Sequence, residues 1–478
     1  MSSDLLQTLA SNLWAVFLVV LLFGGSIFVH ELGHFLAARR RGVHVERFSI
    51  GFGPPIWSYR GRDGVDYRVS WIPLGGYVLL PQLADLGAIE GESEADVSKL
   101  PPISYLTKMI VFVAGAAFNI LFALALACIV WVIGQPVASE LSSTTVAEVL
   151  PTLKNADGKD VPSPASKAGL KPGDVIVGID GEPVATFNDI VEHLALSSGW
   201  TSSGERETVF RIRRGSETID LPIRPILGGN EKFRMIGFVP VAKIVVGRVT
   251  PGLAADRAGL RADDQIVAID GKPVLTRPQL GDALRPVLSR PVKIGVLRAE
   301  QNLTLLLELP KDAKVSAIGL ALRDGIIYAH PTPFAQVGDC IVKTFRTLGA
   351  LLNPRSDIGL SHLSGPIGII SNFVDVSRAG LPFALWFTIL VNVNLAIFNL
   401  LPIPVLDGGQ MLFATIGRLR GRPLPVSFIT TAQSVFVVLL FSMVLYVSVF
   451  DVRRIARDVK ADRAAESAAK AEAAPPGK

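Results

Sequence analysis

The feature that most restricts this fold is an apolar run that contains three ionisable residues. His30, Glu31 and His34 lie in the run from 13 to 38, which is long enough to cross a membrane as a helix. They form an H-E-x-x-H pattern, which on a helix places two histidines one turn apart on the same face. Ionisable groups inside a span are costly and mark function. The run therefore predicts a metal site within a membrane helix.

The chemistry expected of this pattern is zinc-dependent hydrolysis. Two imidazoles one turn apart can bind a single Zn²⁺. Glu31 lies on an adjacent face, where it can serve as a general base toward the attacking water. Chance is a poor explanation, because the whole chain has six histidines. Helical rise puts His30 about 25 Å from Leu13, in a hydrocarbon core about 30 Å thick.

Three further runs have the length and apolarity of membrane spans. They cover 109–134, 381–402 and 428–450, and 49% of the chain is hydrophobic. The fold class predicted is thus an α-helical polytopic membrane protein with four transmembrane helices. The basic residues at 39–41 and 418–422 fall on one side, which the positive-inside rule makes cytoplasmic. The basic tail would then lie on the outer side, which counts against this orientation.

The start of the chain carries no lysine or arginine before its apolar run. A cleavable signal peptide has a basic stretch there, so we expect the first run to stay in the protein as a span.

Asp407 is the candidate for the third metal ligand that a catalytic zinc site requires. It ends the stretch "NLLPIPVLD" after the third span, where Pro402 and Pro404 cannot continue a regular helix. The carboxylate is then free to turn inward, although a helix stop followed by a polar turn explains the same residues. Asn394 and Asn399, with the two prolines, are candidate substrate-binding residues. Packing between spans explains the asparagines equally well.

A repeat lies between the second and third spans. The segment "ASKAGLKPGDVIVGIDGEPV" at 165–184 matches "ADRAGLRADDQIVAIDGKPV" at 255–274, an offset of 90 residues. The pattern of short helix, tight turn, strand and hairpin looks like the PDZ fold, which binds extended peptides at a sheet edge. We predict two inserted α+β PDZ-like domains, at 135–240 and 241–325. A pair of spacers without a ligand is the alternative.

The remaining segments complete the predicted organisation. Gly, Pro and alternating residues at 48–81 predict a membrane-associated β-hairpin region within the first half of the membrane domain. The two halves of that domain are 1–134 and 381–450. Between and after them we expect a surface amphipathic helix with a linker at 326–380 and a polar, disordered tail at 451–478. Cys128 and Cys340 show no metal or disulfide spacing and are interpreted as packing residues.

Taken in order, these motifs resemble the bacterial site-2 protease family. "HELGH", "GFGP" with "IPLGGYV", the tandem repeat, "LSGPIGI" and "NLLPIPVLDGG" span nearly the whole chain and are most similar to the regulator-of-sigma-E protease branch. The resemblance implies that His30, His34 and Asp407 bind zinc, that Glu31 is catalytic, and that the hairpins re-enter the membrane near the metal. One departure is Ala116, where the family commonly has proline in its second span.

The function expected is a zinc-dependent intramembrane endopeptidase that cleaves single-pass membrane proteins within or near their spans. By resemblance, a pre-trimmed anti-sigma factor or a signal-peptide remnant is the substrate. The expected place is a bacterial inner membrane, with the active site near the cytoplasmic face and the PDZ-like domains in the periplasm. Those domains would gate access or bind a peptide tail, and the bilayer is the other partner.

Two other functions compete with this interpretation. One is a catalytically inactive scaffold whose PDZ-like domains bind peptide tails, and the other is an ion transporter that uses the intramembrane histidines. The intact H-E-x-x-H argues against the scaffold, and the absence of repeat symmetry among the spans argues against the transporter. The net charge of +5 is spread beside the spans and over the soluble segments, so no nucleic-acid partner is expected.

Overall fold

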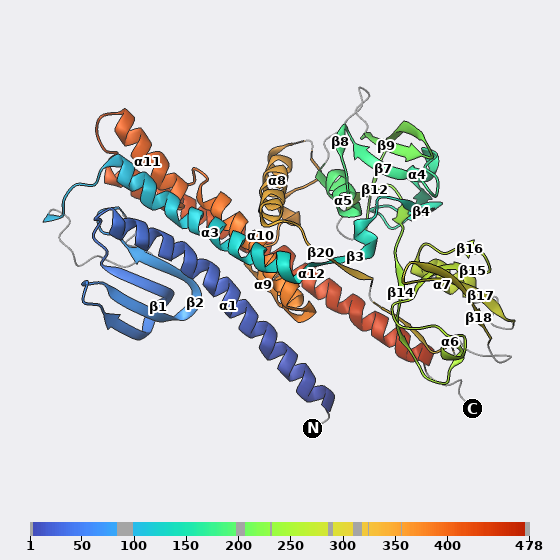
Figure 1. Cartoon of the computed structure of the whole chain (residues 1–478). Coiled ribbons are helices and arrows are strands. Elements are labelled where there is room, and N and C mark those ends of the chain that lie inside the picture. The colour runs from blue at the N-terminus through green and yellow to red at the C-terminus, as the bar shows by residue number, and fades with distance from the viewer. Residues whose placement is uncertain are drawn as a thin grey trace. The chain divides into compact units, whose positions relative to one another are not determined.

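The computed structural model describes residues 3–83, 99–196, 206–229, 232–284, 290–308, 318–323, 325–354 and 356–473. The chain divides into two compact units (Figure 1). We call the first, Met1–Gln135 with His330–Arg346 and Leu360–Lys478, the membrane unit. We call the second, Pro136–Ala329 with Thr347–Gly359, the repeat unit.

Four helices of the membrane unit are long and apolar enough to cross a membrane, as predicted. They are α1 (Ser3–Arg40), α3 (Tyr105–Ile133), α10 (Leu381–Asn399) and α12 (Val426–Ala473). The third span was predicted to reach 402, but α10 ends at Asn399. Its end precedes Pro402, which lacks the N–H that a helix needs.

Helix α3 packs against both α1 and α10 (Figure 1). Gly33 permits the close approach of α1 to α3, because a Cβ at this position would lie 2.5 Å from the carbonyl oxygen of Ala114. Apolar side chains then fill the space between the helices, which aligns the two histidines of α1 with α3. The buried core comprises Leu18, Leu22, Ala123, Leu126, Ala127, Val130, Val337, Cys340, Phe373, Ala384, Leu385, Ile389 and Val393.

Three shorter helices belong wholly or, for α8, mainly to this unit, and two of them were not predicted. Helix α8 (Pro333–Leu352) matches the expected amphipathic helix, and its Gln336 and Cys340 are buried against the spans. Helix α9 (Pro366–Ala379) lies where a linker was predicted, and α11 (Asp407–Leu419) follows the third span. A 3₁₀ turn, Leu360–His362, precedes α9. Helices α9 and α11 are short, so their apolar periodicity was too brief to recognise.

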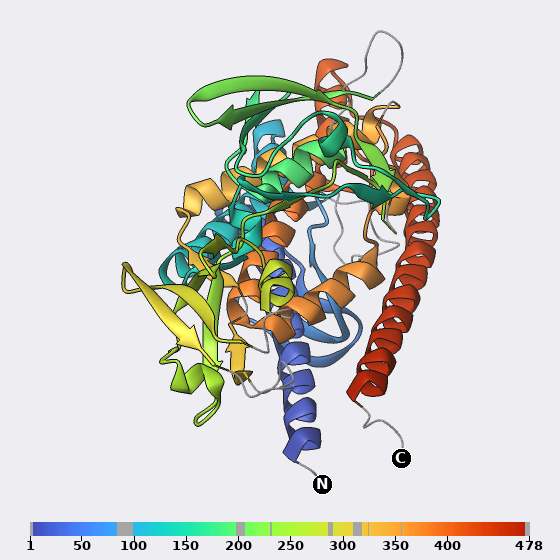
Figure 2. The same ribbon diagram turned by 90° about the vertical axis from the view of Figure 1, so that its right-hand side faces the viewer.

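The predicted disordered tail is corrected over 451–473. Helix α12 continues without a break to Ala473 (Figure 2), and 474–478 lie outside the described residues. Alanine, arginine, lysine and glutamate dominate this stretch, and all four have high helix propensity.

The segment predicted as hairpins forms the strands β1 (Arg47–Arg60) and β2 (Asp66–Leu79). Both strands bend, so residues 47–50 have partners in 66–69 on one side and in 76–79 on the other. The segment 57–60 pairs with 66–69, which leaves 76–79 and 57–60 at the two edges. One face packs on α1 through Phe35 and Phe48. Elsewhere the two strands expose apolar residues suited to a membrane interface: Ile56, Trp57, Tyr59, Trp71 and Ile72.

The repeat unit contains two modules with the same order of elements. The first has strand order β10-β9-β7-β8, with β4 and β13 paired beside it, and the second has β18-β17-β15-β14-β19, with β16 on β15. The first module comprises β4 (Val146–Val149), α4 (Pro164–Lys167), β7 (Val175–Ile179), β8 (Glu182–Pro183), α5 (Phe187–Leu196), β9 (Thr208–Arg214), β10 (Glu217–Ile223) and β13 (Phe238–Pro240). The second comprises β14 (Ile244–Val249), α6 (Ala254–Arg257), β15 (Gln265–Ile269), β16 (Lys272–Pro273), α7 (Arg277–Leu284), β17 (Val292–Arg298), β18 (Gln301–Leu307) and β19 (Leu320–Leu322).

Short pairs surround these modules. They are β3 (Gln135–Ala138) with β20 (Ile326–Ala329), β5 (Thr152–Lys154) with β6 (Asp160–Pro162), and β11 (Ile226–Gly228) with β12 (Phe233–Met235). A 3₁₀ turn, Ser139–Ser142, follows β3.

An ion pair between a buried aspartate and a partly exposed arginine recurs at the same place in each module. Arg214 donates to both carboxylate oxygens of Asp174 at 2.7 Å, and Arg298 donates to those of Asp264 at 2.6 and 2.7 Å. Burial raises the pKa of each aspartate, but the arginine and a backbone N–H outweigh it and hold the pKa below its usual value. The two aspartates belong to the matched segments, and the two arginines, which lie outside those segments, extend the correspondence between the modules.

Candidate metal centre

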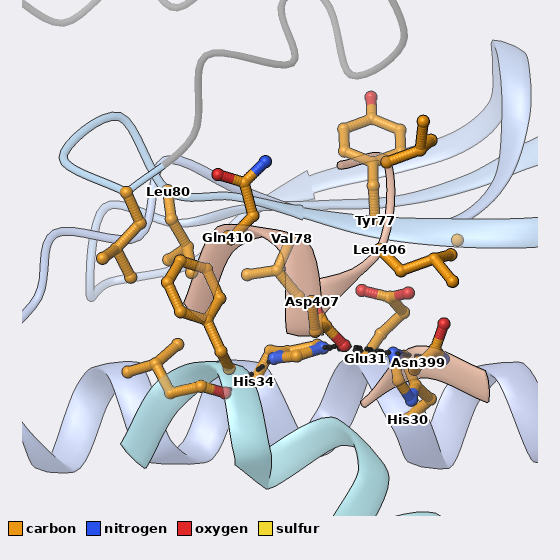
Figure 3. Close-up of a pocket in the computed structure, with 15 residues that line it drawn as sticks. His30, Glu31, His34, Tyr77, Val78, Leu80, Asn399, Leu406, Asp407 and Gln410 are labelled. Carbon is orange, nitrogen blue, oxygen red and sulfur yellow. Dashed lines mark hydrogen bonds and ion pairs between the residues drawn. The ribbon is translucent and has the colours of Figure 1, made fainter. Parts of the chain in front are cut away.

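Three side chains from two distant segments converge inside the membrane unit (Figure 3). His30 and His34 come from successive turns of α1, and their Nε2 atoms lie 3.1 Å apart. Asp407 comes from the first turn of α11, and its Oδ2 lies 3.4 Å from each of those nitrogens. The structure thus brings the three predicted ligands to one point.

The turn before α11 directs Asp407 toward the histidines. The chain leaves α10 at Asn399, turns through Pro402 and Pro404, and starts a new helix at Asp407. Gly408 and Gly409 are required there, because a Cβ on either would clash with the backbone of 400–404. This is the unwinding that the two prolines predicted.

The donor set fits zinc. A tetrahedral zinc with bonds of about 2.0–2.1 Å holds its ligand atoms about 3.3 Å apart, and the three separations here are 3.1, 3.4 and 3.4 Å. The Oδ2 of Asp407 is buried and lacks a hydrogen-bond partner, which a metal ion would supply. Two imidazoles and one carboxylate leave a fourth position open, as in catalytic zinc sites.

Neighbouring groups on α3 orient both imidazoles. His34 donates from Nδ1 to the carbonyl oxygen of Val111 at 2.8 Å, which leaves Nε2 for the metal. The amide nitrogen of Asn119 lies 3.2 Å from Nδ1 of His30, and the amide oxygen of Asn119 is buried without a partner. A half-turn of this amide would bring the oxygen to Nδ1, where it could accept the hydrogen bond that His30 donates when its Nε2 binds a metal.

Glu31 lies beside the three ligands in a cavity of about 200 Å³. Gly76 of β2 is packed against it, since a Cβ there would lie 3.1 Å from Cγ of Glu31. The edge segment 76–79 therefore borders the carboxylate directly (Figure 3). The cavity is lined by His30, Glu31, His34, Gly76, Tyr77, Val78, Leu80, Leu83, Val111, Phe112, Asn399, Val405, Leu406, Asp407 and Gln410.

The predicted substrate-binding residues occupy different places. Asn399 lines the cavity, 3.4 Å from Nε2 of His30. Asn394 instead accepts a hydrogen bond from Thr344 of α8 and does not line the cavity. Pro402 and Pro404 shape the turn and are also absent from the lining.

The sequence did not identify Gly115 and Asn119 of α3 as parts of the site. Glycine and asparagine four residues apart in an apolar span were the available signal, since that spacing places both on one helical face. A Cβ at Gly115 would clash with Nε2 of His34 and lie 2.7 Å from Cε1 of His30.

Gly115→Ala is therefore expected to displace both imidazoles and lower zinc content and cleavage together. Ala116→Gly is the control, because this neighbour is also buried and takes no part in the hydrogen bonds described for the two imidazoles. Metal analysis of the purified variants measures the effect. Full zinc occupancy in Gly115→Ala would contradict this prediction, because α1 and α3 would then accommodate the methyl group without displacing the imidazoles.

The site and the spans together define a membrane-embedded metallohydrolase, and comparison with known proteins specifies the family. The Peptidase family M50 model matches residues 18–443, so the chain belongs to peptidase family M50, the site-2 proteases.

Its relatives have the same extent. The regulator of sigma-E protease RseP of Escherichia coli K12 is 30% identical over 474 residues, covering 91% of this chain and 98% of the relative. The protease RseP of Yersinia pestis is 32% identical over 473 residues, with the same coverage. The predicted family, the assignment as a zinc metalloprotease and zinc as cofactor are confirmed.

Proposed function

We propose that this protein is a zinc-dependent intramembrane endopeptidase that cleaves single-pass membrane proteins within or near their transmembrane segment. The observation that carries the proposal is the position of His30, Glu31 and His34 inside the apolar helix Asn12–Arg40. A site at this depth suits a substrate that is itself a membrane helix. Cleavage of a membrane-spanning reporter by the wild type and by Glu31→Gln, described in the Discussion, is the test.

The roles of the site residues follow from their positions. His30, His34 and Asp407 would hold the zinc, which when bound supplies a Lewis acid at the scissile carbonyl. Glu31 would take a proton from the attacking water and pass it to the leaving amine. Val111 and Asn119 would keep the imidazoles in the tautomer that leaves Nε2 free for the metal.

The edge segment 76–79 is the proposed docking site for substrate. A transmembrane helix hides its peptide groups in internal hydrogen bonds, so it must unwind before hydrolysis. An unwound segment can add to a sheet edge through main-chain hydrogen bonds. Among the described residues, 76–79 pairs only with 47–50, which leaves its other edge free beside Glu31. Asn399, on the opposite wall, is the proposed polar contact to the substrate.

The sidedness of the protein is part of the same proposal. The basic residues at 39–41 and 418–422 would mark the cytoplasmic face of a bacterial inner membrane. The segment 135–325 follows the opposite end of α3 and would lie in the periplasm. A pre-trimmed anti-sigma factor, or a signal-peptide remnant, would then reach the site from the membrane.

The two modules would act as PDZ-like domains that limit access for substrates with large outer domains. The repeat unit has its own cores, separate from those of the membrane unit. The modules thus do not contribute residues to the three-ligand cluster. Control of cleavage by them would be steric or conformational.

Deleting 140–325 is therefore expected to allow cleavage of a substrate that still carries its outer domain. The comparison uses full-length and deleted protein on one substrate, with and without that domain. If both proteins reject the long substrate equally, gating is wrong. If the deleted protein binds zinc but cuts neither form, the modules are needed for docking.

An inactive scaffold that presents its modules to peptide tails is the alternative function. It predicts no cleavage and no requirement for metal. Loss of reporter cleavage on chelation, with recovery on adding zinc, would exclude it.

A further inference from the structure

A second cavity, of about 540 Å³, lies beside the metal pocket within the membrane unit. It is formed by residues 81–83 after β2, by the start of α3, by α11 and by the start of α12. Its volume is within the range of small-molecule sites. Nothing in the proposed hydrolysis uses it.

The charge of this cavity is one-sided. Lys108, Arg418 and Arg422 line it, and none of the described residues of its lining is acidic. The guanidinium of Arg418 stacks on the ring of Tyr105, 4.9 Å from its centroid. Within the part of the chain that the structure describes, no carboxylate is paired with Lys108 or Arg422. Three positive charges around a cavity without a counter-charge favour an anionic ligand.

The cavity also lies where a lipid headgroup would be. Arg41, at the end of α1, donates two hydrogen bonds to Thr107, the residue before Lys108. The cavity therefore shares the end of the spans that bears the basic residues 39–41. In the orientation proposed above, this end lies at the membrane interface, where lipid phosphates are found.

Apolar side chains also line the cavity. They include Phe413 of α11, Leu424, and Val426 and Ile429 at the start of the span α12. A soluble anion would gain nothing from these side chains, whereas the first methylenes of an acyl chain would be buried against them. The combination of cationic and apolar side chains is the pattern of a phospholipid site.

We propose that this cavity binds the phosphate headgroup of an anionic phospholipid, with Lys108 and Arg422 contacting the phosphate. The acyl chains run along the start of α12. Gln410 lines both cavities, one helical turn after Asp407, so the lipid packs against the helix that carries this ligand. A bound anionic lipid thereby restrains α11 and the position of Asp407.

The test measures lipid binding to the full-length protein by native mass spectrometry in detergent, with phosphatidylglycerol titrated in. Lys108→Gln with Arg422→Gln is expected to bind it about 25-fold more weakly, because each basic residue near lipid phosphate contributes on the order of a fivefold affinity gain. The matched control is Arg40→Gln with Arg420→Gln. It removes two exposed charges at the same end, and neither residue lines the cavity.

Three results would overturn the proposal. One is equal binding by the test and control pairs. Another is displacement of the lipid by millimolar inorganic phosphate, which would make this a site for soluble anions. The third is a wild type that binds uncharged diacylglycerol as tightly as phosphatidylglycerol, which would mean a nonspecific apolar groove. This last comparison needs no variant and so does not depend on whether the substituted proteins fold.

Discussion

Replacing Glu31 with glutamine is expected to lower cleavage by about 10²–10⁴-fold while zinc stays bound. Glutamine has the size of glutamate but cannot accept a proton from water. The three ligand atoms belong to His30, His34 and Asp407, so the metal site should be unchanged. The measurement is turnover of a membrane-spanning reporter, with zinc content determined on the same samples.

Glu46→Gln is the matched control, because Glu46 belongs to the same unit and does not line the pocket. It should cleave at the wild-type rate. Near-normal turnover by Glu31→Gln with full zinc occupancy would remove Glu31 from the mechanism. Loss of zinc in that variant would instead show that Glu31 supports the metal.

The parts of this site that could be predicted are those encoded locally. His30, Glu31 and His34 lie within about one turn of a single helix, so their relative positions follow from helix periodicity alone. Asp407 required a second inference, because its approach depends on the break at Pro402. That break is also local.

The contacts that complete the site are not local. Val111 and Asn119 reach the imidazoles across the interface between α1 and α3, from residues 77 and 89 positions away in the chain. Gly115 is needed only because two helices approach closely there. The apolar periodicity of one segment predicts which of its own faces is buried, but not which face of another segment it packs against. The same reason explains why Asn394, expected near the substrate, instead bonds to Thr344 of α8.

The fold shows a similar division. The number of spans and the repeat could be predicted, because the spans are long apolar runs and the repeat is a direct match between two segments. The sequence predicted hairpins in this region but not the bend that lets 47–50 pair with both 66–69 and 76–79. The bend could not be predicted because it depends on pairing between residues that are distant in the chain. The edge that borders Glu31 is created by that bend, so the proposed docking of substrate could be argued from the sequence only by resemblance.

Replacing any one of His30, His34 or Asp407 with alanine is expected to lower zinc affinity by about 100-fold or more and to abolish cleavage. Even residues that only support a ligand cost about 10–100-fold when removed, and each of these three would lose a direct bond. His44→Ala is the control, since this histidine lies in the same unit outside the pocket. Metal analysis after dialysis against a dilute chelator gives the ranking.

The same variants test whether the metal also holds the structure together. The ligands come from α1 and α11, near opposite ends of the chain, so bound zinc ties the turn after α10 to the first span. A ligand that binds only the native arrangement stabilises it in proportion to its affinity. Hydrogen exchange in 400–410 should therefore rise in Asp407→Ala and in the chelated wild type, to the same extent. If Asp407→Ala keeps full zinc and slow exchange, another residue completes the site and the turn is held by its own packing.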